Sequence, residues 1–417
     1  MANNHTAGAA ARTFAPSELC QRMLAKTSKG TCGPCILYLE DGTIFYGRAC
    51  GAEGTATGEV CFNTSLEGYF EVMTDPSYAG QIVTMTYPQI GNYGIDETDV
   101  QSAFPGDAVR PASAPAMRGM IVRDMCATPS NWRSAVSVPE YLRAHGIVAI
   151  EGVDTRALVR HLRDNGSKMG IISTEIFDVD ELAERLTAAP TLVGENLVKT
   201  VSCPEPHAFA AVDLPATHDF ALTAAAPARH KVVAYDCGVK RGILEGLVRA
   251  GCDLTVVPWD TPAQQVLDMN PDGVFLSNGS GDPDAVVETY EQVQQLIGKV
   301  PVFGICLGHQ MISLACGAQM EKLKFGHRGG NQPVMNLVSR RVEITAQNHG
   351  FGLLFPSLGK LVPELSGGET EHAADGDLRV WVRRGIAPVV MNERFGRIRL
   401  THVNLNDGTA EGIQLLD

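Results

Sequence analysis

The residue with the clearest chemical potential is Cys306, which lies in the stretch Gly304-Ile305-Cys306-Leu307-Gly308. The apolar run at 300–305 predicts a buried strand, and residues 311–315 predict the start of a helix. Glycines two residues before and two after the cysteine let the backbone turn sharply and present the thiol at the helix start. Peptide dipoles favour a thiolate there. The pattern therefore favours a nucleophile that forms a thioester over a cysteine buried only for packing.

A second loop is expected beside this turn. Residues 277–283, Ser-Asn-Gly-Ser-Gly-Asp-Pro, follow the preceding predicted strand. The loop lacks the Lys-Ser/Thr of a P-loop and the spacing of a dinucleotide fingerprint, so a phosphate site is disfavoured. A backbone N–H from this loop and the N–H of Leu307 would instead hold the oxyanion of a tetrahedral intermediate.

A thiolate that attacks an amide also needs a base to carry the proton to the leaving ammonia. The histidines considered for this role are His309, His327, His349 and His402. His309 follows the cysteine on the predicted helix and is expected to point away from the sulfur. Nothing in the spacing singles out His349 either, so each of these histidines is interpreted as a hydrogen-bonded structural residue.

Composition limits the class of protein. The 417 residues are too many for one ordinary core, and 44% apolar with 19% charged residues indicates a folded chain. A net charge of −13 argues against nucleic acid as a partner, and no apolar run is long enough to span a bilayer. Eleven scattered cysteines, an odd number, fit a reducing compartment. These features predict a cytoplasmic protein.

The chain divides into regions by pattern. Residues 1–34 are interpreted as a disordered extension, with an organelle transit peptide as the alternative. Residues 35–200 are β-rich with some helices, and 201–229, rich in alanine and proline, are the predicted linker. Residues 230–417 begin with alternating strands and helices, which predicts a doubly wound, flavodoxin-like α/β domain with a parallel sheet. Sites in such sheets lie at the carboxyl ends of the strands.

Two smaller patterns, a pair of cysteines and a row of arginines, are interpreted without a functional role. Cys32 and Cys35 have the Cys-x-x-Cys spacing of a redox motif, but a strand follows them where that motif needs a helix. Asp154 is the predicted cap of a helix at 157–163. Three arginines at positions 156, 160 and 163 on that helix are interpreted as a solvated face unless a partner docks there.

The motifs together resemble the carbamoyl-phosphate synthase small chain family of class I glutamine amidotransferases, from about Cys35 to Gln414. Stretches 303–310, 325–329 and 345–351 suit several amidotransferases. The motifs that single out this family lie in the N-terminal half, at 62–64, 68–69, 74–78, 86–88 and 152–158, with 404–409 near the end.

The resemblance implies roles for matching positions. Cys306 would attack the amide carbon of L-glutamine. The substrate would be bound by residues from four loops: Ser77, Gly279, Gly281, Leu307, Gln310, Asn348, Gly350 and Phe351. The resemblance implies no metal and no cofactor in this chain.

The resemblance also implies a partner. Ammonia would pass through a tunnel to a large subunit, which uses ATP and Mg²⁺ to make carbamoyl phosphate from bicarbonate for arginine and pyrimidine synthesis. The two chains would form a heterodimer or a higher oligomer.

Three departures from the family pattern matter. Ser280 replaces a proline in the glycine loop, which costs rigidity. Residues 352–396 are interpreted as a surface insertion, with 378–382 strand-like. The family's catalytic histidine and glutamate lie in a His-Pro-Glu motif, whereas the sequence stops at Leu415-Leu416-Asp417. Truncation of an active enzyme is the favoured interpretation. The alternatives are a catalytically dead scaffold subunit and an amidotransferase of another pathway.

Overall fold

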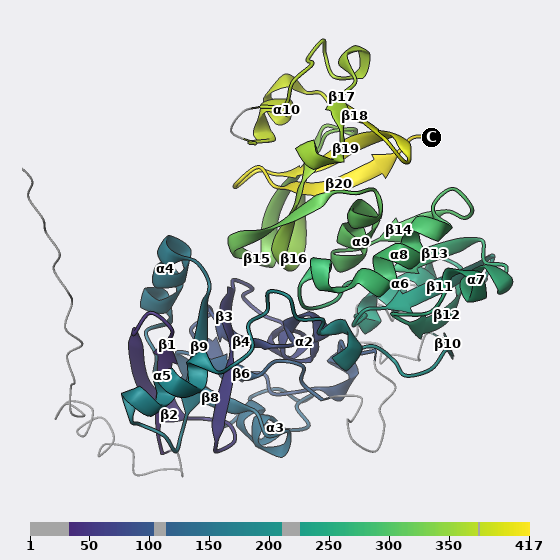
Figure 1. Cartoon of the computed structure of the whole chain (residues 1–417). Coiled ribbons are helices and arrows are strands. Elements are labelled where there is room, and N and C mark those ends of the chain that lie inside the picture. Colours follow the sequence, from purple (N-terminus) through teal and green to yellow (C-terminus); the bar gives the residue numbers. More distant parts are fainter. Residues whose placement is uncertain (1–32, 104–113, 211–225, 374–375) are drawn as a thin grey trace, which may run out of the picture.

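The computed structural model describes residues 33–103, 114–210, 226–373 and 376–417. Three bodies of regular structure follow one another along the chain (Figure 1). They are a closed barrel, a five-stranded sheet with helices, and a six-stranded antiparallel sheet. Residues 1–32, and with them Cys32 and nearly all of the predicted extension, lie outside the described residues.

The barrel is the β-rich body predicted for the N-terminal half. Its strand order is β1-β2-β8-β6-β4-β3-β9, with parallel pairs between β3, β4, β6 and β8 and antiparallel pairs elsewhere. Apolar side chains such as Leu37, Val60, Ile82 and Ile150 are fully buried in it. The strands are β1 (Pro34–Leu39), β2 (Ile44–Ala49), β3 (Thr55–Asn63), β4 (Gln81–Met85), β6 (Gly119–Ile121), β8 (Val148–Glu151) and β9 (Lys168–Ser173).

Helices and short pieces complete this half. The Asp154 carboxylate accepts a hydrogen bond from Ala157 N at 3.0 Å, so the predicted cap is present. Ser137 and Glu140 form a capping box at the start of α3. The elements are α2 (Tyr69–Thr74), the 3₁₀ turns η1 (Pro76–Tyr78) and η2 (Glu97–Asp99), β5 (Gln89–Ile90), β7 (Asp124–Met125), α3 (Val138–Ala144), α4 (Thr155–Asn165), α5 (Val179–Thr187) and η3 (Val198–Thr200).

The five-stranded sheet is the predicted α/β unit. Its order is β10-β12-β11-β13-β14, and all pairs are parallel except β10 with β12. β10 lies inside the segment interpreted as a linker, so that segment is partly structured; residues 211–225 lie outside the described residues. The elements are β10 (His207–Phe209), β11 (His230–Asp236), α6 (Arg241–Arg249), β12 (Cys252–Pro258), α7 (Ala263–Asp268), β13 (Gly273–Leu276), η5 (Pro283–Ala285), α8 (Val287–Leu296), β14 (Val302–Gly304) and α9 (Leu307–Ala315).

The strand before Cys306 is less buried than its sequence predicts. β14 pairs only with β13, so it forms an edge of the sheet among the described residues. Phe303 is 59% exposed, although the 300–305 run is apolar enough for a core strand. The prediction of a buried strand is therefore wrong, because no described strand pairs with its second edge.

The six-stranded sheet corrects the interpretation of 352–396 as a surface insertion. Segments from this region bury Phe355, Trp381 and Val390 in a core that they share with residues outside it, such as Leu400 and Ala410. Residues 379–384 form a helix where 378–382 were predicted to be strand-like. The elements are β15 (Gln319–Asn336), β16 (Arg341–Leu354), η6 (Phe355–Leu358), β17 (Lys360–Leu361), η7 (Pro363–Leu365), α10 (Arg379–Arg384), β18 (Val389–Asn392), β19 (Gly396–Asn404) and β20 (Ala410–Leu415).

Polar contacts join the barrel to both sheets. Asn278 Nδ2 donates to Ser77 Oγ at 3.0 Å, and Lys240 Nζ lies 3.3 Å from an Asp75 oxygen. From the six-stranded sheet, Lys322 forms an ion pair with Glu59. These contacts place the 3₁₀ turn η1 of the barrel against the glycine loop.

The structure bears on two further predictions, which concern redox activity at Cys35 and membrane-spanning segments. Cys35 is buried in β1, and burial raises the pKa of its thiol to about 12, which is unsuited to redox exchange. Over the described parts of the chain, none of the helices has both the length and the apolar character that crossing a membrane requires.

Candidate active site

The turn around Cys306 has the shape that its glycines predict. Cys306 precedes α9 with φ 54°, an uncommon value for a residue with a side chain. A Cβ on Gly304 would lie 2.4 Å from the Gly308 carbonyl carbon, and one on Gly308 would lie 2.1 Å from Leu276 O. Only glycine fits at both positions, so strand, thiol and helix are held in close contact.

The thiol itself is not poised as a thiolate. The poorly hydrated surroundings of the sulfur and the carboxylate of Asp75 raise the pKa of Cys306 to about 12, although the Leu307 N–H acts in the opposite direction. The thiol donates a hydrogen bond to Asn348 O, with the sulfur 3.7 Å from that oxygen. The helix dipole alone would favour a thiolate, but burial and nearby negative charge have the larger effect on the pKa and keep the thiol protonated.

The predicted substrate-binding residues surround one small cavity. It has a volume of about 30 Å³, and its lining includes Cys306 together with all eight residues predicted to bind glutamine. The structure thus brings together positions from the barrel, the glycine loop, α9 and β16. The eight are Ser77, Gly279, Gly281, Leu307, Gln310, Asn348, Gly350 and Phe351.

Local contacts explain how these positions meet. Asp75 accepts from Ser77 N at 2.9 Å and so shapes η1, which carries Ser77 to the glycine loop. A Cβ on Gly279 would lie 2.4 Å from Cys237 O, so this glycine permits a close approach of two loops. On the opposite wall, Gln310 Nε2 donates to Phe351 O at 2.8 Å and ties α9 to β16.

The cavity is lined by polar groups that lack partners. Four buried side-chain atoms of lining residues have no hydrogen-bond partner among the described residues. Such atoms are rare in folded proteins and indicate water or a polar ligand. They are Gln81 Oε1, Ser280 Oγ, Arg328 Nε and Asn348 Nδ2. Gln81, Arg328 and Glu59, another lining residue, were missed in the sequence because their position depends on how the barrel meets the sheets.

A larger cavity of about 710 Å³ lies on another side of Cys306. Its walls include the exposed edge strand β14 and parts of β16 and β20. The buried Nε2 of His309 has no partner among the described residues, and burial lowers the pKa of this imidazole to about 4. His349 and Glu411 also line this cavity.

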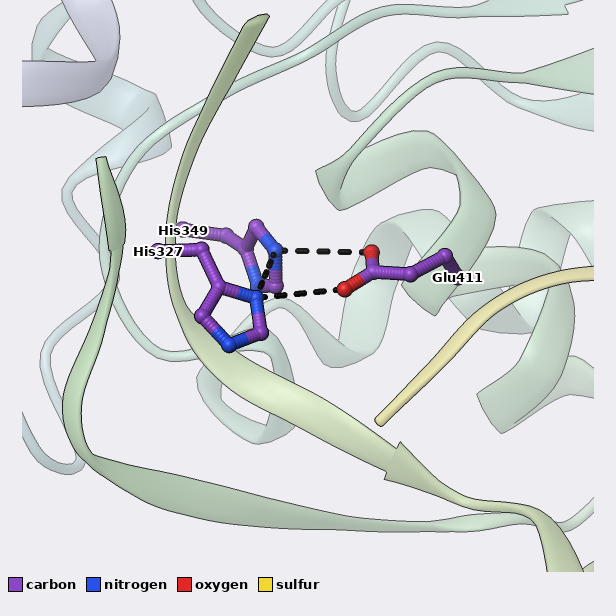
Figure 2. Close-up of side chains that lie close together, drawn as sticks. All are labelled: His327, His349 and Glu411. Atoms are coloured by element: carbon purple, nitrogen blue, oxygen red, sulfur yellow. Dashed lines mark hydrogen bonds and ion pairs between the residues drawn. The ribbon is translucent and has the colours of Figure 1, made fainter. Parts of the chain in front are cut away.

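Two of the histidines considered as bases form a cluster with Glu411 (Figure 2). His327 Nδ1 lies 3.2 Å from His349 Nε2 and 3.1 Å from Glu411 Oε1. The other nitrogen of each ring is also engaged, His327 Nε2 with Asp407 Oδ2 at 2.6 Å and His349 Nδ1 with Phe351 O at 2.9 Å. Neither ring therefore has a nitrogen free for the Cys306 thiol, in keeping with the structural role predicted for both.

Charge in this cluster is strongly perturbed. Burial opposes protonation of His327, but hydrogen bonds to Asp407 and then to Glu411 outweigh it and raise the pKa of the imidazole to about 9. The pKa of Glu411 is lowered, because hydrogen bonds to His327 and His349 outweigh the effect of burial. His402 lies apart from these contacts, with Nδ1 2.9 Å from Thr401 Oγ1. Glu411 carried no signal in the sequence, because 84 residues separate it from His327.

Comparisons with known proteins cover nearly the whole chain. Residues 37–172 match the family described as carbamoyl-phosphate synthase small chain, CPSase domain, and residues 233–358 match glutamine amidotransferase class-I. The "Carbamoyl phosphate synthase small chain" of Syntrophotalea carbinolica is 48% identical over 379 residues, which are 91% of this chain and 88% of that protein. The protein of the same name from Thermotoga maritima is 44% identical and covers 92% of this chain and 90% of its own length. That from Thermosynechococcus vestitus is 49% identical, covering 80% and 84%.

Proposed function

Because the chain belongs to the carbamoyl-phosphate synthase small chain family, we propose that it is the glutaminase subunit of that synthase. It hydrolyses L-glutamine through a thioester on Cys306 and passes ammonia to a large ATP-dependent subunit. One observation supports this most directly. The residues expected to bind glutamine line one cavity, in which four buried polar atoms lack partners.

The proposed reaction uses these groups in sequence. The Cys306 sulfur attacks the side-chain amide carbon of glutamine, and the carbonyl oxygen becomes an oxyanion near the Leu307 N–H and the glycine loop. Collapse of this intermediate breaks the C–N bond and releases ammonia, with the thiol proton carried to the nitrogen. Water then attacks the thioester and releases glutamate. The unpartnered groups of Arg328, Asn348 and Gln81 provide polar contacts for the amino-acid end of the substrate.

The partner and the product complete the proposal. A large subunit binds ATP and Mg²⁺ and converts bicarbonate and the delivered ammonia into carbamoyl phosphate for arginine and pyrimidine synthesis. This chain then requires neither cofactor for its own step. We expect the two subunits to form a heterodimer, or a higher oligomer, in the cytoplasm.

Co-expression with a large subunit tests this function. The full chain and its partner, supplied with glutamine as the only nitrogen donor, are expected to produce carbamoyl phosphate. The Cys306→Ala variant, paired with the same large subunit, should produce carbamoyl phosphate only from added ammonia. If the unaltered pair also works only with ammonia, the glutaminase proposal is wrong.

A second candidate is a scaffold subunit without catalysis. The raised pKa of Cys306 and the engaged rings of His327 and His349 favour it. A glutamine-like chloroketone separates the two, because only an activated thiol reacts selectively. Rapid labelling of Cys306 that glutamine suppresses supports the enzyme, whereas labelling no faster than that of a simple thiol supports the scaffold.

A further inference from the structure

The His327–His349–Glu411 cluster has the arrangement of a metal site. His327 lies on β15, His349 on β16 and Glu411 on β20, so three strands of one sheet each contribute one ligand group (Figure 2). The donor atoms converge: His327 Nδ1 is 3.2 Å from His349 Nε2 and 3.1 Å from Glu411 Oε1, and His349 Nε2 is 3.5 Å from Glu411 Oε2. Ligands of a tetrahedral zinc ion lie roughly 3.3 Å apart when each bond is about 2.0–2.1 Å.

The outer contacts of both rings are those of ligating histidines. A histidine that binds metal through one nitrogen usually donates the N–H of the other to a carboxylate or a backbone carbonyl. His327 Nε2 contacts Asp407 Oδ2, and His349 Nδ1 contacts Phe351 O. In the tautomers whose protons point outward, His327 Nδ1 and His349 Nε2 direct lone pairs toward each other and toward Glu411, where a metal ion could bind them.

The charges of the cluster suit a cation. Two carboxylates, Asp407 and Glu411, contact His327, whose charged ring is their counter-ion in the metal-free chain, and no lysine or arginine of the described residues pairs with either. A metal ion bound at His327 Nδ1 would displace the proton there. A divalent ion would balance both charges. Two imidazoles and one carboxylate suit zinc better than magnesium or calcium, which prefer ligands made only of oxygen.

We propose that His327, His349 and Glu411 bind a zinc ion, with Gln347 Oε1 as the fourth ligand. Gln347 Oε1 lies 3.3 Å from His349 Nε2. Asn404 Nδ2 now lies in the same space, 3.3 Å from His327 Nδ1, and donates to Glu411 Oε1 at 3.3 Å and to Gln347 Oε1 at 3.4 Å. These long hydrogen bonds are the contacts that the ion replaces.

The ion would influence the proposed glutamine pocket by holding parts of its wall in position. It would tie β15, β16 and β20 together and fix the ring of His349. That ring and the Gln310 amide share one acceptor, Phe351 O, in the wall of the small cavity. Zinc binding therefore holds residues 348–351 in place. The proposed zinc site itself does not depend on the glutaminase proposal.

Metal titration of the full chain tests the site. Protein freed of metal with a chelator is titrated with Zn²⁺ against a chromophoric competitor, and with Co²⁺ for its visible spectrum. We expect one zinc per chain. Glu411→Gln and His349→Asn each remove a ligand, so each should lose more affinity than the roughly 10–100-fold that losing an outer-shell partner costs. His372→Asn is the matched control, because this half-buried ring lies elsewhere in the sequence, next to Gly359 O.

Two further measurements keep the test decisive. Thermal melts establish that each variant folds, and the Co²⁺ spectrum of the unaltered protein needs no variant at all. A four-coordinate spectrum without thiolate charge-transfer bands, unchanged in Cys306→Ser, supports the site. Absence of zinc binding, equal binding by Glu411→Gln, or thiolate bands would overturn it.

Discussion

The cavities on the two sides of Cys306 differ in how fully the protein encloses them. On one side, a cavity of about 30 Å³ is enclosed by the barrel, the glycine loop, α9 and β16, and its lining includes every predicted substrate residue. On the other, a cavity of about 710 Å³ has the exposed strand β14 as one wall. There His309 is buried without a partner for Nε2 among the described residues, and His349 is held in the cluster with Glu411.

The two cavities bear on two separate predicted steps, the recognition of a polar substrate and the transfer of the thiol proton. The small cavity presents unpartnered polar groups that a polar substrate would satisfy. In the larger one, no imidazole of the described residues hydrogen-bonds to the Cys306 sulfur, which instead contacts Asn348 O. The residues predicted to bind substrate are thus brought together in this structure, while no activating contact to the thiol is seen among the described residues, and experiments on each side should give different results.

The largest effect is expected from Cys306→Ser in the complex with the large subunit. Loss of the nucleophile should reduce glutamine-dependent synthesis by roughly 10⁴-fold or more. Ammonia-dependent synthesis should change little, because it bypasses this site. Measuring both rates in one preparation checks this, and a proportional loss of both would indicate damage to the complex instead.

Gly279→Ala should disturb the recognition side by a smaller amount. The added Cβ would lie 2.4 Å from Cys237 O and 2.5 Å from a Leu307 side-chain carbon, so the glycine loop must shift. A displacement of about 1 Å near reacting atoms can cost roughly 10²-fold, seen as lower kcat/KM for glutamine. Gly246→Ala in α6 is the control, because apart from its chain neighbours and the backbone of its own helix nothing lies within 4 Å of the added Cβ. Equal losses in both variants would contradict this account.

The pH dependence of Cys306 alkylation probes the activation side. Its thiol pKa is raised to about 12, so the thiolate is the minor form at neutral pH and its population grows as the pH rises. The rate with iodoacetamide should increase about tenfold per pH unit from 7 to 9, without a plateau. A simple thiol with the ordinary pKa should begin to level off in that range. A plateau for Cys306 near pH 7 would show an activating group that these contacts do not include.

Phe303→Ser should have the smallest effect. The ring is 59% exposed on β14, so its replacement is expected to change the free energy of unfolding by less than about 1 kcal/mol. Phe275 on the neighbouring strand is 1% exposed, and Phe275→Ala should cost about 3–5 kcal/mol. Denaturant unfolding measures both. A large loss from Phe303→Ser would contradict the exposed position of this side chain.

Sequence alone was most informative where geometry is local. The glycines around Cys306 predicted the turn, and Asp154 predicted its own helix cap. The set of substrate positions came from family resemblance, because Ser77 and Gly279 share no local pattern. Glu411 and Asp407 meet His327 across 84 and 80 residues, and a contact of that kind leaves no periodic signal.

Two errors have physical causes. Val380, Trp381 and Val382 favour a strand by intrinsic preference, but Trp381 is 2% exposed and packs into the core of the six-stranded sheet from a helix. The 300–305 run is apolar, yet a strand's burial depends on its neighbours. With a described partner along one edge only, β14 stays accessible whatever its composition.

The hydrogen bond between Asn278 and Ser77 joins residues 201 positions apart in the chain. A contact across so long a loop forms only after the entropy of closing that loop has been lost, so it belongs to the late stages of folding. The barrel and the five-stranded sheet are each built mainly from strands nearer to one another in sequence. The order of assembly therefore delays the small cavity beside Cys306 until both bodies have folded, and Cys306 stays exposed in a partly folded chain.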